Sequence, residues 1–123
     1  MVSRDSSSGT FGVWKKIVMD GGRVVPSALT VPSNGAVAQA VASTPNAIGY
    51  IGLGYMNKEV KPVNVDGVAP TEANTVNGSF PISRPLFMFT NGWPKGDTMA
   101  FLGYVLSEKG QALVKEAGSI PLF

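Results

Sequence analysis

The stretch Arg4-Asp5-Ser6-Ser7-Ser8-Gly9-Thr10 decides the fold class, because it stands where a strand would lead into a helix. Behind it, apolar residues recur at helical spacing: Phe11, Trp14, Ile17 and Val18. Ser8 is well placed to cap this helix, and Asp20-Gly21-Gly22 ends it. The sequence therefore predicts a helix that begins directly after a short loop rich in hydroxyl groups.

The rest of the chain alternates between extended and helical patterns. Four stretches have the composition of strands, the last being the strongest: residues 24–31, 47–53, 60–65 and 82–90. Three further helix starts carry a capping residue: Ser33, Thr71 and Asp97. We expect the helix after Asp97 to be long and to end at Gly118. This alternation predicts an α/β fold with a largely parallel sheet flanked by helices.

The composition excludes several classes of site. The 123 residues, enough for one domain, include no cysteine and no histidine. Disulfide scaffolds, thiolate and imidazole metal sites, and catalysis by cysteine or histidine are thereby excluded. The net charge of +2 is too small an excess to mark a nucleic-acid-binding surface. The first residues also lack the apolar region of a signal peptide.

The hydroxyl-rich loop has two interpretations. Free N–H groups at a helix start bind anions, Gly9 lets a ligand approach the backbone, and the guanidinium of Arg4 suits two oxygens of a tetrahedral oxyanion. Alternatively, Ser8 only caps the helix, and Arg4 is a solvated surface residue. Spacing alone favours this second interpretation, because serine is among the commonest caps.

Two further patterns have structural explanations. The order of Gly49, Gly52 and Gly54 is G-x-x-G-x-G, which differs from the G-x-G-x-x-G of a dinucleotide-binding loop. We expect these glycines to serve turns or close packing. The alternation of Phe87 and Phe89 along a strand is better explained by one buried face than by stacking on a base or sugar.

Four stretches in this order resemble the phosphate-binding proteins of bacterial and archaeal phosphate ABC transporters. Residues 3–10 resemble the R-x-x-x-S-G-T loop of that family, and residues 34–37 with 47–50 resemble its helix and G-A-I-G-Y strand. Residues 80–86 resemble its P-I-S-R-P-L segment, and residues 106–111 its kinked C-terminal helix. The resemblance implies one periplasmic-binding-protein-like lobe, the second of two. Residues 1–80 would form its α/β core, and residues 81–123 a hinge strand and C-terminal helix.

The resemblance also assigns a site. Arg4 would pair with the charge of phosphate, Ser8 would donate its hydroxyl, and Gly9 and Thr10 would donate backbone N–H groups, with the Thr10 hydroxyl as a further donor. Ser6 stands where the family often has an acidic residue that holds the arginine, and Asp5 is the candidate to replace it. The carboxylate that accepts the proton of phosphate, and so rejects sulfate, would lie in the first lobe.

The expected partners follow from the same resemblance: inorganic phosphate, the first lobe of the receptor, and the membrane subunits of an ABC transporter. The location would be extracytoplasmic, and the chain would be a piece of a larger protein. We expect no cofactor, no nucleic acid and no catalysis, with an enzyme on a similar scaffold as a less favoured alternative.

Removing the first lobe would strip partners from five apolar side chains: Phe87, Phe89, Trp93, Phe101 and Leu102. A homodimer, with the C-terminal strand and helix exchanged between chains, would cover them. Alternatively, the last helix folds back and covers them within one chain. The competing function is an isolated lobe that self-associates and binds no anion.

Overall fold

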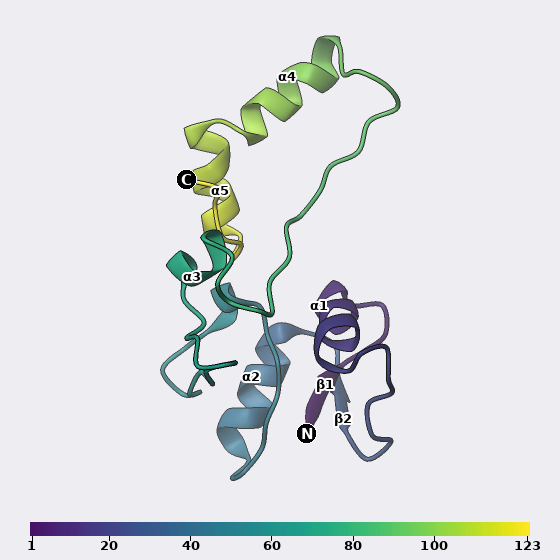
Figure 1. Cartoon of the computed structure of the whole chain (residues 1–123), viewed down its shortest axis with the longest axis vertical. Coiled ribbons are helices and arrows are strands. Elements are labelled where there is room, and N and C mark those ends of the chain that lie inside the picture. The colour runs from purple at the N-terminus through teal and green to yellow at the C-terminus, as the bar shows by residue number, and fades with distance from the viewer.

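The computed structural model describes all residues, 1–123 (Figure 1). Strands β1 (Val2–Arg4) and β2 (Leu29–Val31) form a two-stranded parallel sheet. In its register, Val2 lies opposite Leu29 and Arg4 lies opposite Val31. Helix α1 (Gly9–Val13) continues as the π-helix η1 (Trp14–Val18), and together they lie in the crossover that a parallel pair requires. Helix α2 (Asn34–Ser43) packs against β1. The predicted α/β class with a parallel sheet is confirmed.

The core lies where α2 meets β1. Val2, Val37 and Ala38 are its fully buried apolar side chains. Gly49 completes this contact, since a Cβ there would lie 2.6 Å from Val37 and 3.0 Å from Val41. The expectation that this glycine serves close packing is confirmed.

The prediction of a strand at residues 47–53 is wrong, although part of this segment lies beside β1. The N–H of Val2 donates to the carbonyl of Ile48 at 2.8 Å. Two residues further along β1, the N–H of Arg4 donates instead to the side-chain hydroxyl of Tyr50 at 3.1 Å. A side-chain oxygen thus takes the place of a backbone acceptor, and no backbone ladder continues. The 3-10 helix η2 (Leu53–Tyr55) follows.

The strand predicted at residues 60–65 is also absent, and only an isolated antiparallel bridge joins Val65 to Val68. Helix α3 (Glu72–Val76) then begins as predicted, with the Thr71 hydroxyl accepting from the N–H of Asn74 at 3.1 Å. Strand formation needs a neighbouring backbone, whereas the cap needs only residues three positions away.

Residues 82–90, the strongest strand prediction, form no strand. Figure 1 shows this part of the chain as a long extended segment that leaves the lower body and leads to the last two helices. The side chain of Phe87 is 71% exposed and that of Phe89 is 90% exposed. The composition favours a strand, but no second backbone lies alongside to pair with it.

The long C-terminal helix is two helices, α4 (Gly96–Val105) and α5 (Glu108–Glu116). Asp97 lies in the first turn of α4 and is not its cap, a position held by Lys95 without a side-chain hydrogen bond. Ser107 caps α5 and accepts from the N–H of Gly110 at 3.2 Å. Gly110 is required there, because a Cβ would overlap the carbonyl of Tyr104. The chain leaves α5 at Gly118, whose φ of 80° is left-handed, as predicted.

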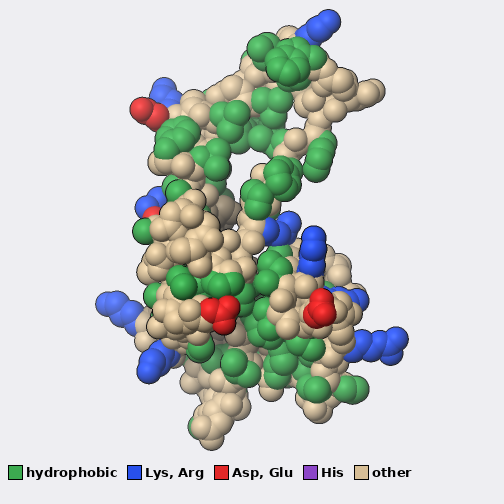
Figure 2. Space-filling model, viewed as in Figure 1, with side chains coloured by type: hydrophobic (Ala, Val, Ile, Leu, Met, Phe, Trp, Pro, Cys, Tyr) green, Lys and Arg blue, Asp and Glu red, His purple; other side chains and the backbone are tan.

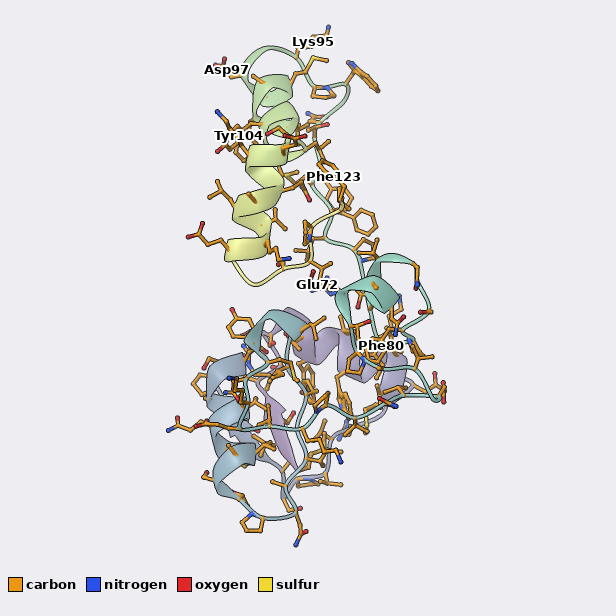
Figure 3. The ribbon with its side chains drawn as sticks, turned by 90° about the vertical axis from the view of Figure 1, so that its left-hand side faces the viewer. Glu72, Phe80, Lys95, Asp97, Tyr104 and Phe123 are labelled. Atoms are coloured by element: carbon orange, nitrogen blue, oxygen red, sulfur yellow. The ribbon has the colours of Figure 1, made fainter.

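Helices α4 and α5 form an arm at the far side of the extended segment from α1 and α2 (Figures 1 and 3). At its base, Lys115 of α5 forms an exposed ion pair of 3.2 Å with Glu72 of α3. A second contact brings Gly54 against the backbone of Gly118 so closely that no Cβ fits at Gly54. None of the helices has the length and apolar character needed to cross a membrane.

The arm leaves much of the apolar surface uncovered. The accessible surface is 8795 Å², against about 6,300 Å² for a compact monomer of this mass. Figure 2 shows hydrophobic side chains on both sides of an opening between the arm and the extended segment. Trp93 is 81% exposed and Phe101 60% exposed. The last helix therefore does not fold back over these side chains.

Candidate anion-binding site

The start of α1 presents unpaired donors at the end of β1. Ser8 caps the helix, and its Oγ accepts from the N–H of Phe11 at 3.3 Å. The N–H groups of Gly9 and Thr10 and the Thr10 hydroxyl donate to no protein atom. Ser8 retains its own hydroxyl proton, since a serine oxygen accepts and donates together. Four donors on three consecutive residues are therefore without a protein acceptor, and Gly9 among these residues is exposed.

The guanidinium of Arg4 is held in place beside this loop. Its Nη1 donates to Oδ1 of Asn34 at 3.1 Å, and its Nη2 donates to the carbonyl of Pro32 at 3.0 Å. The side chain is 13% exposed, and its Nε is buried without a hydrogen-bond partner. Arg4 therefore brings a fixed positive charge to the end of β1, and only two of its five N–H groups donate to protein acceptors.

Asp5 is only a secondary partner of Arg4. Its Oδ2 lies 3.9 Å from Nη2 of Arg4, at the outer limit of an ion pair. Its Oδ1 instead accepts from the hydroxyl and the N–H of Ser7. These hydrogen bonds, with the Ser7 hydroxyl as the largest cause, hold the pKa of Asp5 below its usual value of 3.8. The orientation of Arg4 rests chiefly on Asn34 and Pro32, which sequence reasoning did not connect with it.

Tyr50 supports the same end of β1 from the other side. Its hydroxyl lies 2.7 Å from Oγ of Ser3 and accepts from the N–H of Arg4 at 3.1 Å. Its ring stacks on Trp14 with a centroid separation of 4.5 Å and an interplanar angle of 7°. Because Trp14 begins η1, Tyr50 ties the π-helix to the strand that carries Arg4. The only sequence signal was the tyrosine of the G-A-I-G-Y pattern.

A second guanidinium reaches the loop from the extended segment. A Cβ at Gly9 would lie 2.6 Å from Nη2 of Arg84 and 3.8 Å from its Cζ. Arg84 makes no hydrogen bond or ion pair, and its residue is exposed. Sequence reasoning noted this arginine only as part of the P-I-S-R-P-L pattern. Figure 2 shows Lys and Arg side chains gathered around α1 and the start of the extended segment.

The arrangement suits binding of an anion by donors and positive charge. The groups at this end of β1 are backbone N–H groups, hydroxyls and guanidinium groups, which match the oxygens of a tetrahedral oxyanion. Nowhere in the chain do three or more side chains of the His, Cys, Asp and Glu types come together as a potential metal site.

Comparisons with known proteins give concordant names. Phosphate-binding protein PstS of Pseudomonas aeruginosa is 36% identical over 99% of this chain, which spans 41% of that protein. Phosphate-binding protein PstS 2 of Streptococcus agalactiae is 37% identical over 99% of this chain, which spans 45% of it. These relatives are named as binding proteins, and the chain spans less than half of their length.

Solved structures agree in fold. The phosphate-binding protein of a phosphate ABC transporter from Streptococcus pneumoniae superposes with a TM-score of 0.81 at 28% identity, over 99% of this chain and 51% of that one. A phosphate ABC transporter substrate-binding protein from Clostridium perfringens, solved with bound phosphate, gives 0.79 at 32% identity over the same shares. Residues 1–109 match the model of the PBP superfamily domain, and the chain therefore belongs to that superfamily.

Proposed function

We propose that this chain binds phosphate, as one of two lobes of the receptor of a phosphate ABC import system. Arg4, Ser8, Gly9 and Thr10 would form its half of the site. The observation that carries the proposal is the pair of unpaired N–H groups at Gly9 and Thr10 beside the fixed guanidinium of Arg4. The phosphate in the similar Clostridium perfringens protein supports the choice of anion.

The partner surface is formed by residues 81–123, which comprise the extended segment, the arm and the C-terminal residues after it. Residues 1–80 would be the lobe core, and residues 81–123 would contain the hinge and the C-terminal helices that pack on the first lobe. The surface in excess of a compact monomer, about 2,500 Å², is larger than the roughly 800 Å² that each partner buries in a standard interface. Membrane subunits of the transporter would meet the assembled receptor in an extracytoplasmic location.

A half-site should bind weakly. Donors on an open surface act in water, where charged hydrogen bonds are screened, and no second lobe excludes solvent. We expect a dissociation constant on the order of a millimolar, or about −4 kcal/mol.

Phosphate titration followed by amide NMR tests the proposal. Saturable shifts should centre on Gly9 and Thr10. Arg4→Gln should weaken them, and Arg23→Gln, which removes an exposed charge elsewhere, is the matched control. The spectrum of the Arg4 variant before titration establishes that it is folded. Shifts that are absent from wild type, or equally affected by both variants, would contradict the proposal.

A second candidate function is a lobe that acts only by self-association, without anion binding. It is favoured by the exposure of Phe89 and Trp93, at 90% and 81%, which gives a second copy an apolar surface to cover. The copies could exchange the extended segment with α4 and α5. Sedimentation at tens of micromolar should then show a dimer that Phe89→Glu weakens. A species of 12.8 kDa at all concentrations would exclude the dimer.

A further inference from the structure

Arg84 occupies a position that the proposed function does not use. Its guanidinium lies over the Cα of Gly9, at a distance where any side chain on residue 9 would overlap Nη2. Gly9 has no left-handed φ, so backbone conformation does not require glycine there. A side chain at residue 9 would instead displace the guanidinium of Arg84 from this place.

The backbone sets this position. The N–H of Phe80 donates to the carbonyl of Asn74 at 2.9 Å, and the hydroxyl of Ser83 donates to the carbonyl of Phe80 at 3.2 Å. These bonds fix the start of the extended segment on α3. Pro85 then restricts Arg84 to extended backbone, because its ring excludes the helical region for the residue before it. Arg84 is therefore delivered to the loop by a held segment.

The charge around Arg84 is unbalanced. The start of α1 carries the partial positive charge of its free N–H groups, and Arg4 adds a full one. The nearby carboxylate, Asp5, is hydrogen-bonded to Ser7 and lies near Arg4. A guanidinium without a partner at this place is repelled by its surroundings until an anion arrives.

Arg4 and Arg84 also differ in how many of their N–H groups already donate to protein atoms. Both terminal nitrogens of Arg4 already donate to protein acceptors, whereas every donor of Arg84 is unused. A bidentate guanidinium–oxyanion contact needs two parallel free N–H groups. Arg84 has all of its N–H groups free for such a contact, whereas the guanidinium of Arg4 is oriented by Asn34 and Pro32.

We propose that Arg84 is a further phosphate-binding residue, which makes the bidentate contact to the anion held by Gly9 and Thr10. The inference rests on the proposed phosphate site and adds a ligand to it from outside the R-x-x-x-S-G-T loop. Ligand binding would thereby connect the start of α1 to the extended segment.

The test is a titration with inorganic phosphate of wild type, Arg84→Gln, Arg84→Lys and the control Arg23→Gln. We expect Arg84→Gln to weaken phosphate binding about five- to tenfold. This loss lies between what an exposed ion pair contributes and what a hydrogen bond to a charged group contributes. Arg84→Lys should recover only part of this loss, because it keeps the charge and lacks the planar fork. Because Arg84 makes no protein hydrogen bond, the variants should fold as wild type does.

A direct readout of the contact is available in the wild-type protein. The Nε–H resonance of Arg84, assigned by its loss in Arg84→Gln, should shift in wild type along the same binding curve as the amides of Gly9 and Thr10. Equal affinities of Arg84→Gln and Arg23→Gln, with an unmoved Nε–H resonance, would overturn the inference and leave the proposed function standing. If wild type shows no amide shifts at Gly9 and Thr10, both fail.

Discussion

Replacing Tyr50 by phenylalanine tests how the end of β1 is held in the geometry that the anion site needs. The substitution removes one oxygen and keeps the ring, so the stacking on Trp14 at 4.5 Å is retained. The lost hydroxyl is the acceptor for the N–H of Arg4 and a partner of the Ser3 hydroxyl.

The loss of stability in Tyr50→Phe depends on which hydrogen-bonding groups are left without a partner. Ser3 is 2% exposed, so water does not readily replace the missing partner, although its hydroxyl still reaches the carbonyl of Arg4 at 3.2 Å. The N–H of Arg4 has no such substitute. A buried donor left without an acceptor costs about 1–3 kcal/mol, and we expect Tyr50→Phe to lower the free energy of unfolding by about 2 kcal/mol.

Urea unfolding followed by circular dichroism measures this loss. With a urea dependence of about 2 kcal/mol per molar, the midpoint should fall by about 1 M. Tyr55→Phe is the matched control, because the Tyr55 hydroxyl makes no hydrogen bond and the residue is 47% exposed. It should change stability by about 0.5 kcal/mol or less. Equal midpoints for the two variants would refute the role assigned to the Tyr50 hydroxyl.

Two further predictions use the same unfolding measurement. Gly54→Ala forces a methyl group into the backbone of Gly118 and should lower the free energy of unfolding by about 1–3 kcal/mol. The control Gly12→Ala has open space around it and should stabilise α1 by up to about 1 kcal/mol. Similar losses of stability in both variants would contradict the close contact. The hydrogen bonds from Ser7 lower the folded-state pKa of Asp5 below its usual 3.8, so the stability that they add is present above that value and is lost as the pH falls through the lowered pKa. Asp5→Asn should therefore flatten the decline of stability between about pH 5 and about pH 2, and parallel declines would exclude this contribution.

Local features were predictable from the sequence because their partners lie a few residues away. The hydroxyls of Ser8, Ser33 and Thr71 each accept from an N–H three positions later, as their places before apolar runs predicted. The loop that presents free N–H groups beside Arg4 was predictable for the same reason, because it also depends on residues that are near one another in the sequence.

Features that depend on distant partners were not predictable in this way. Residues 82–90 have strand composition, but pairing needs a neighbouring backbone that the chain does not place there. Residues 47–50 do lie beside β1, yet the Tyr50 side chain takes a hydrogen bond that a strand would give to backbone. Asn34 and Arg84 reach the site from about 30 and 75 residues away, so no spacing rule connects them with it.

The open site and the uncovered arm point to one physical requirement. The N–H groups of Gly9 and Thr10 have no protein acceptor, and hydrophobic side chains flank the opening seen in Figure 2. A body that covered the extended segment beside Arg84 would also remove water from the loop, and charged hydrogen bonds strengthen as the local dielectric constant falls. If phosphate contacts both bodies, thermodynamic linkage requires that phosphate tighten their association by the same factor by which association tightens phosphate binding. On the proposed function, the weak affinity expected for the single chain and its large exposed apolar surface would have one cause, the absence of a contact with the first lobe.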